Sequence, residues 1–172
     1  LSIYFVSMHQ FRIVLVFFLV RAFSTQCVQA QEQDKNQSRQ YYDLAKEMVT
    51  ATRAVDDARE LMVIAANFDT TNSVANFEAG QMYIHTINKE LAEKFFNRVY
   101  RQQPNYRFDL EYWIGRSYQY GLQFDRALDF YNRYKNKLQK TSTNYSGDDK
   151  IEMKEVDRRI EECNNGKEFV AS

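Results

Sequence analysis

Residue types that commonly catalyse reactions or bind metals are scarce in this chain of 172 residues. His85 has no second histidine, cysteine or aspartate at the spacing of metal ligands, so we expect it on a helix surface or in a groove. Cys163 follows Glu161 and Glu162, whose carboxylates raise the pKa of a thiol instead of activating it. These residues therefore predict no catalytic group, no metal site and no cofactor.

Charge and glycine content argue against further classes of function. The chain has 23 basic and 23 acidic residues, so its formal net charge of zero gives no electrostatic reason to bind nucleic acid. It has no glycine-rich phosphate-binding loop. The pairs Asp148-Asp149 and Glu161-Glu162 fit solvated helix ends better than a general acid and base. We expect a protein that is not an enzyme and that acts by binding.

One group of side chains has the composition of a protein-binding surface. Tyr112, Arg116 and Tyr120 are spaced at i, i+4 and i+8, which places them on one stripe of a helix. Aromatic and arginine side chains contribute much of the binding energy at protein interfaces. The stripe is therefore the first candidate for contact with a partner.

An internal repeat predicts the helices that position this stripe. A pattern of glycine, tyrosine, alanine and an aromatic residue occurs twice, thirty-five residues apart, and Pro104 closes the first copy. We expect each glycine to let one helix approach its partner closely, and each alanine to lie where the two helices cross. The copies are Gly80, Tyr83, Ala92 and Phe96, then Gly115, Tyr118, Ala127 and Tyr131, after a more degenerate copy with Ala45, Val49, Ala58, Met62 and Ala65.

Apolar spacing and turn residues predict one all-helical domain. Asn88 is an expected N-cap, Gly121 an expected C-cap, and Asn164-Asn165-Gly166 an expected helix stop. The expected helices are hairpins of about 40–52 with 55–67, 73–86 with 89–102, and 108–120 with 124–139, followed by a capping helix at 148–163.

These paired copies resemble the tetratricopeptide repeat (TPR). The resemblance covers 40–163 and implies an all-α fold, a TPR-like α-solenoid of three antiparallel helical hairpins plus a C-terminal capping helix. The chain departs from the family pattern at the early tryptophan, where it has Asn76 and Glu111, and at the second closing proline, where it has Gln139. An ordinary amphipathic bundle is the alternative.

The resemblance also implies a binding face, because the first helix of each TPR hairpin lines a concave surface. The alternative assigns Phe77 and Tyr112 to the core. One variant of the family grips terminal carboxylates with lysines and asparagines, which this chain does not reproduce. The implied partner-binding residues are Phe77, Gln81, Ile84, Tyr112, Arg116 and Tyr120, with His85 and Gln119 beside them and Asp43, Glu47 and Thr50 from the first hairpin.

Residues 1–30 predict a secretory signal peptide that starts at Met8. A short apolar run, Ile13–Val20, is too short to span a bilayer, and the small residue Ala30 precedes the expected cleavage point. The alternative is a lipoprotein signal in which Cys27 is acylated. In both cases we expect an exported, periplasmic protein.

The segments that flank the domain are predicted to be linkers. Residues 31–39 are polar and without periodicity, which indicates a short tether. Residues 164–172 follow the expected helix stop and are interpreted as the start of a linker to a missing downstream domain.

A second resemblance concerns the hairpin YWIGRSYQYGLQFDRALDFYNRYK and the tail EVDRRIEECNNGKEFVAS. Both are similar to the N-terminal TPR module of Bacteroidetes envelope proteins that continue into a Tol-type β-propeller and an OmpA-type peptidoglycan-binding domain. Some of those proteins belong to the type IX secretion and gliding machinery.

The resemblance implies an outer-membrane-associated scaffold that binds another envelope protein or peptide. A membrane would be reached through a lipid anchor or missing domains, and peptidoglycan only through a missing C-terminal domain. The alternatives are a freestanding periplasmic chaperone-like module and the regulatory domain of an enzyme encoded downstream.

Overall fold

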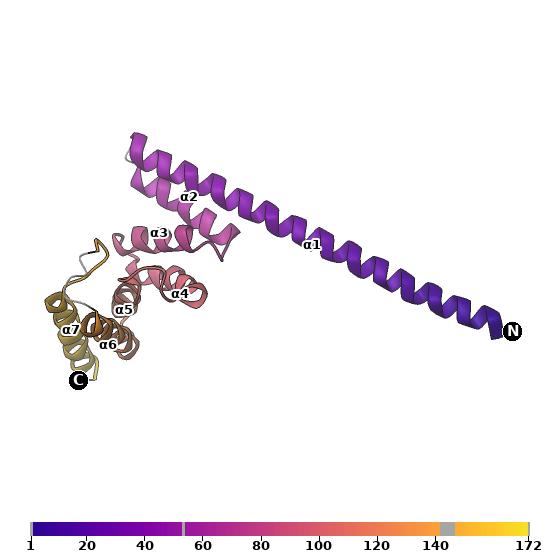
Figure 1. The fold of residues 1–172 in the computed structure, drawn as a ribbon. Helices are drawn as coiled ribbons and strands as arrows, with labels where there is room; N and C mark the ends of the chain where they lie inside the picture. The colour runs from indigo at the N-terminus through magenta and orange to yellow at the C-terminus, as the bar shows by residue number, and fades with distance from the viewer. Residues whose placement is uncertain (1, 53, 142–146, 172) are drawn as a thin grey trace.

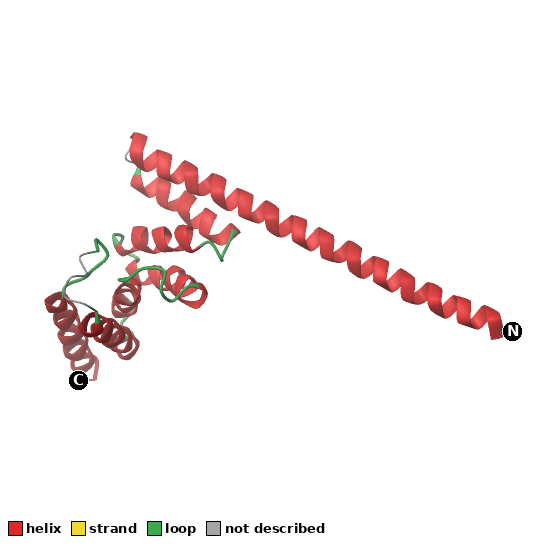
Figure 2. Ribbon diagram, in the orientation of Figure 1, coloured by secondary structure: helices red, strands yellow, loops and turns green. Residues whose placement is uncertain are grey.

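The computed structural model describes residues 2–52, 54–141 and 147–171, with side chains described in 26–51, 54–141 and 147–170. Throughout this part the regular structure is helical and contains no strand (Figure 2), so the expected all-α class is confirmed. The helices are α1 (Ser2–Thr52), α2 (Val55–Phe68), α3 (Ser73–Ile84), the 3₁₀ helix η1 (Lys89–Leu91), α4 (Ala92–Gln102), α5 (Leu110–Tyr120), α6 (Phe124–Lys140) and α7 (Met153–Ala171).

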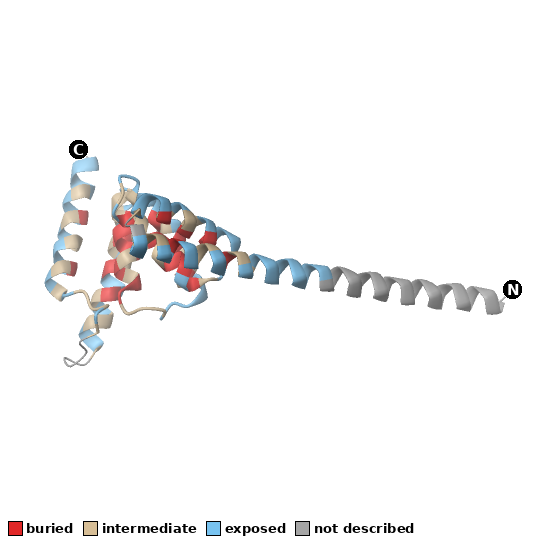
Figure 3. Ribbon diagram, turned by 90° about the horizontal axis from the view of Figure 1, so that it is seen from above, coloured by how far each residue is buried: buried red, intermediate tan, exposed pale blue. Residues whose placement is uncertain are grey.

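Helices that are adjacent in the sequence are also the main neighbours in space. α1 packs on α2, α3 on α4 and α5 on α6, and each of these pairs contacts the next one. α7 packs on α6 at the far end of the body (Figure 1). α1 is longer than its partner, so its residues 26–34 are exposed and extend away from the body (Figure 3).

The repeated glycines lie at the closest approach of two helices. A Cβ atom on Gly80 would lie 2.6 Å from Cε1 of Phe96, and one on Gly115 would lie 2.7 Å from Cε1 of Tyr131. Real Cβ atoms do not approach carbon this closely, so only glycine fits while the rings stay where they are. The expected role of both glycines is confirmed.

Aromatic contacts repeat with the same spacing of thirty-five residues. Tyr83 stacks on Phe95 with ring centroids 5.6 Å apart, and Tyr118 stacks on Phe130 at 5.7 Å. The equivalent inner pairs are Phe77 with Phe96 at 5.5 Å and Tyr112 with Tyr131 at 5.8 Å. The cations that cover the stacked rings repeat as well, since Arg98 lies 5.4 Å from the centre of Phe95 and Arg133 lies 5.3 Å from that of Phe130. The second and third helix pairs are therefore built from the same contacts.

The alanines of all three copies of the pattern are fully buried. Ala92 and Ala127 are fully buried in the larger apolar cluster, which joins α3 to α7. Ala45, Met62 and Ala65 are fully buried in a second cluster that joins α1 and α2 to α3 and α4. Close packing of this kind leaves no space for larger side chains at the alanine positions.

The N-terminal prediction differs from the structure at residues 31–39. They belong to α1 and do not form an irregular tether. Ser38 is completely buried, and its Oγ accepts a hydrogen bond from Nδ2 of Asn72 at 3.1 Å, which attaches this turn of α1 to the start of α3. Most of the predicted signal peptide lies outside the residues whose side chains are described. Among those described residues, no helix has the length and apolar content needed to cross a membrane.

The C-terminal prediction is also corrected. The capping helix begins at Met153, five residues later than expected, and it continues through Asn164-Asn165-Gly166 to Ala171. Gly166 lies inside the helix, and its lack of a side chain allows close packing: a Cβ atom there would lie 2.6 Å from Cζ of Phe124. The expected linker at 164–172 is therefore helical as far as Ala171.

Two expected caps differ in detail. Asn88 precedes η1 and its side chain makes no capping hydrogen bond, whereas the unpredicted Asn72 accepts one from the backbone of Ala75 at 3.1 Å. Gly121 follows α5 as expected, but its φ is −81°. The left-handed conformation falls on the next residue, Leu122, with φ of 56°.

Candidate interaction surface

The predicted partner-binding face is largely covered in the folded chain. Phe77, Ile84, Tyr112 and Arg116 are between 4 and 8% exposed. Gln81 and Tyr120 are partly exposed, and the flanking His85, Asp43, Glu47 and Thr50 are exposed. The structure therefore leaves only the edges of this face open to solvent.

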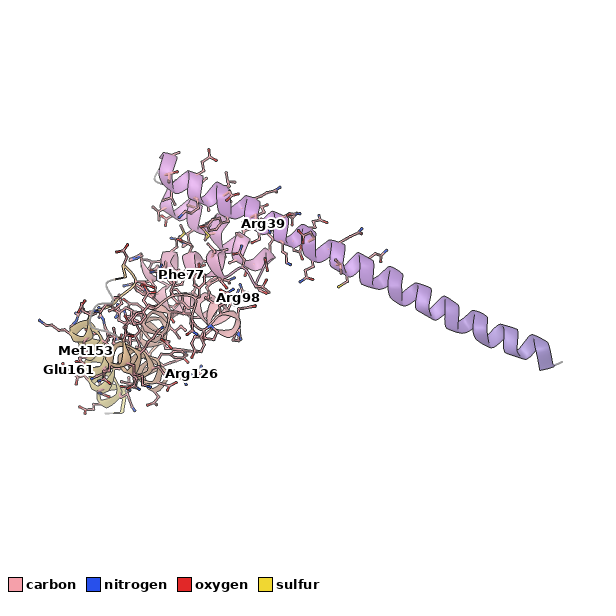
Figure 4. The ribbon with its side chains drawn as sticks, in the orientation of Figure 1. Arg39, Phe77, Arg98, Arg126, Met153 and Glu161 are labelled. Carbon is pink, nitrogen blue, oxygen red and sulfur yellow. The ribbon has the colours of Figure 1, made fainter. Side chains whose placement is uncertain are left out.

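Phe77 is covered by the loop between α4 and α5. The ring of Tyr106 lies 5.7 Å from that of Phe77, and the guanidinium of Arg107 lies 4.9 Å above it. Arg107 is held in turn by the carboxylate of Asp109, at 2.9 Å from its Nε. Phe77, labelled on α3 in Figure 4, thus has a packing role in the described structure.

The α5 part of the face is covered by α7. The hydroxyl of Tyr112 donates to Oε1 of Glu155 at 3.0 Å, and Nε2 of Gln119 donates to Oε2 of Glu162 at 2.9 Å. Both pairs are separated by 43 residues, so the two helices run in the same direction and in register along this seam. Arg159 lies between the two carboxylates, 2.7 Å from Glu155 and 2.8 Å from Glu162.

Arg116 lies under this seam with no carboxylate partner. It is 8% exposed, and its Nη1 donates to Oε1 of Gln119 at 3.2 Å while Nη2 donates to the hydroxyl of Tyr120. Its guanidinium lies 4.5 Å from the centre of the Tyr120 ring. None of the ion pairs between described residues includes Arg116, although buried charges in proteins are usually paired.

The buried groups around Arg116 stay neutral. Burial, with a smaller contribution from the charge of Glu162, raises the pKa of Cys163 to about 11. Burial also raises the pKa of Tyr131, well above its ordinary value. Cys163 therefore has a packing role in the apolar cluster.

An open hollow of about 690 Å³ lies beside the exposed part of the face. It is next to Tyr120, because Nζ of Lys89 on its rim is 4.9 Å from the centre of the Tyr120 ring. Both apolar and charged side chains line it. Its lining residues are Val55, Asp56, Arg59, Met82, His85, Thr86, Ile87 and Lys89.

Apolar side chains are also exposed at the ends of the helix pairs. Ile87 is 94% exposed, and Leu122 and Val170 are 67 and 68% exposed. Leu122 and Val170 line a second hollow, of about 470 Å³, at the turn between α5 and α6. The sequence analysis did not single out these residues. Leu122 could have been recognised as an exposed apolar residue, because it directly follows Gly121, the expected end of a helix.

No cluster of histidine, cysteine and carboxylate side chains suited to a metal ion occurs in the described part of the chain. His85 lies at the end of α3 on the rim of the larger hollow. Comparison with family models found none that matches the chain, and no curated protein matches it either.

Proposed function

We propose that the protein is a non-catalytic protein–protein interaction scaffold of the bacterial cell envelope, built as a TPR-like α-solenoid. The recurrence of the same glycine, aromatic and arginine contacts thirty-five residues apart is the observation that carries the proposal. Repeats of helix pairs commonly present extended surfaces to protein partners. The proposed contact region consists of the partly exposed Gln81, of Tyr120 and of the hollow next to Tyr120.

The proposed location rests on the sequence of residues 1–30, which has the order of a secretory signal. The similarity of the last hairpin and tail to Bacteroidetes envelope proteins supports a place at the outer membrane, beside type IX secretion or gliding components. In this proposal further domains would provide anchoring, and the helical domain would provide the partner contact.

Site-specific photo-crosslinking in the producing bacterium tests the proposal. A photoreactive phenylalanine analogue would replace Tyr120 or Gln81 on the proposed surface. Asn132, exposed on α6, would serve as the matched control position. We expect one discrete crosslinked envelope protein from the first two positions and none from the third. Absence of adducts at all three positions would refute the scaffold proposal.

A chaperone-like module is the second candidate, favoured by the exposed Ile87, Leu122 and Val170. Exposed apolar side chains at several helix-pair ends suit transient contact with unfolded chains. This function predicts a broad series of adducts from crosslinkers placed at Ile87 and Leu122, in contrast to the single adduct expected of a scaffold. The pattern of bands distinguishes the two.

A further inference from the structure

The contact between α5 and α7 differs in kind from the other helix contacts. α7 approaches α6 closely along its length, but it reaches α5 mainly through the ends of long polar side chains. Val156 and Cys163 are the fully buried apolar residues of α7 among those described. α7 is therefore held on α5 by two carboxylate hydrogen bonds and a small apolar contact.

The side of α7 that meets α5 and α6 has a repeating composition. Glu155 is followed by the buried Val156, and seven residues later Glu162 is followed by the buried Cys163. Arg159 lies between the two glutamates in the sequence. On α5 the hydrogen-bond donors Tyr112 and Gln119 are also seven residues apart. A helix with carboxylates at i and i+7 therefore fits this face of α5, whether or not it belongs to the same chain.

The face of α5 beneath α7 carries the positive charge of Arg116, which pairs with no carboxylate of a described residue. The guanidinium of Arg116 is buried there, and its described hydrogen bonds go to an amide and a hydroxyl oxygen. Glu155 and Glu162 are engaged by Arg158 and Arg159 of α7 itself. A carboxylate that reached Arg116 directly would neutralise a charge that has no counter-ion among the described residues.

We propose that α7 is a displaceable segment occupying a helix-binding face of α5, and that this face binds a partner helix carrying carboxylates at i and i+7. The inference rests on the proposed scaffold function and names the chemistry of its partner. Tyr112 and Gln119 receive the two carboxylates, and Arg116 attracts an acidic segment. In the free protein α7 occupies the face and lowers its apparent affinity for such a helix.

A labelled synthetic peptide of residues 153–171 serves as the probe, and the full chain is the receptor. The test variant is Glu155→Gln with Glu162→Gln, which weakens the hold of α7 on α5. The matched control is Glu152→Gln with Glu161→Gln, an equal change of charge at exposed positions. Glu161 lies on α7 (Figure 4), and Glu152 directly precedes that helix. Binding is measured by fluorescence anisotropy.

We expect the peptide to bind the test variant at least about tenfold more tightly than the unaltered chain or the control, because the face is more often open. A peptide with both glutamates replaced by glutamine should bind all three chains weakly. Equal binding of the natural peptide to the three chains, or binding to none of them, would overturn the proposal.

If the test variant fails to fold, amide hydrogen exchange on the unaltered chain tests whether α7 is displaceable. Amides of α7 should exchange faster than those of α5 and α6, since α7 opens separately. Equal protection in the three helices would show that α7 is a permanent part of the core. Neither measurement involves a cellular partner, so failure here is distinct from failure of the scaffold proposal.

Discussion

Gly80 and Gly115 occupy positions at which a single methyl group would collide with an aromatic ring. The rings belong to Phe96 and Tyr131, which are themselves fully buried. Gly121 provides the contrast, because a Cβ atom there would have its nearest contact at 3.5 Å, an ordinary van der Waals distance. Gly80 and Gly115 therefore share one role, close helix packing, which Gly121 does not have.

Substitution of Gly115 by alanine should reduce the free energy of unfolding by about 1–3 kcal/mol, since the added methyl overpacks the site against Tyr131. Gly80→Ala should have an effect of similar size against Phe96. Thermal or urea unfolding measures both. Gly121→Ala is the matched control and should change stability by less than about 1 kcal/mol. Equal effects at all three glycines would contradict the close approach.

Much of this residue-level structure could be predicted from the sequence. The spacing of Gly80 and Gly115 relative to Phe96 and Tyr131 has the period of stacked helix pairs, and the contacts follow that period. The burial of Tyr112 and Arg116, unlike these glycine contacts, does not follow from the repeat spacing. Their exposure depends on whether another helix covers α5, which is a property of long-range packing and not of local spacing.

At the level of helices, α7 shows where local signals fail. Asn164-Asn165-Gly166 has the composition of a helix stop, yet the helix continues to Ala171, and the missing Cβ of Gly166 lets the ring of Phe124 lie close to it. Likewise 31–39 lack an apolar period but contain no glycine or proline, so α1 continues through them to the buried contact of Ser38. Tertiary contacts decide both cases.

The packing of α7 on α5 should depend on pH. Burial opposes ionisation of Glu155, but hydrogen bonds from Arg158, Tyr112 and Arg159 outweigh it and hold the pKa below its ordinary value. Burial likewise opposes ionisation of Glu162, while Arg159, Gln119 and Arg158 lower its pKa. The hydrogen bonds from Tyr112 and Gln119 form only when α7 lies on α5, and they favour the ionised carboxylates. Their contribution is therefore present above the ordinary glutamate pKa and is lost as the pH falls through the lowered values.

Amide NMR spectra recorded between about pH 6 and pH 3 should therefore show α7 signals shifting below about pH 4, before those of α3 and α4. The Glu155→Gln, Glu162→Gln chain provides the control, since it has lost the titrating groups and should show a smaller change at α7. Simultaneous loss of all helices in both chains would instead indicate general acid unfolding.

Across the whole molecule, the two cysteines report on two different environments. Cys27 is exposed on the extended part of α1, and Cys163 is buried between α7 and the helices below it. A thiol reagent added near neutral pH should modify Cys27 quickly and Cys163 slowly, because burial both blocks access to Cys163 and raises its pKa to about 11.

Mass spectrometry of the labelled chain checks this difference. The variant Glu155→Gln, Glu162→Gln should accelerate the modification of Cys163 and leave that of Cys27 unchanged, so that Cys27 acts as an internal standard. Equal rates at both cysteines in the unaltered chain would mean that α7 does not protect its own thiol.

The neighbour-to-neighbour arrangement of the helices has a consequence for how the chain folds. Because α1 packs on α2, α3 on α4 and α5 on α6, most contacts close short loops and carry a small entropic cost. Chains with such local contacts fold quickly, and an early helix pair can form before the later ones have left the ribosome or an export channel. α7 emerges after α5 and α6, so for a short interval the nascent protein presents the face of α5 uncovered.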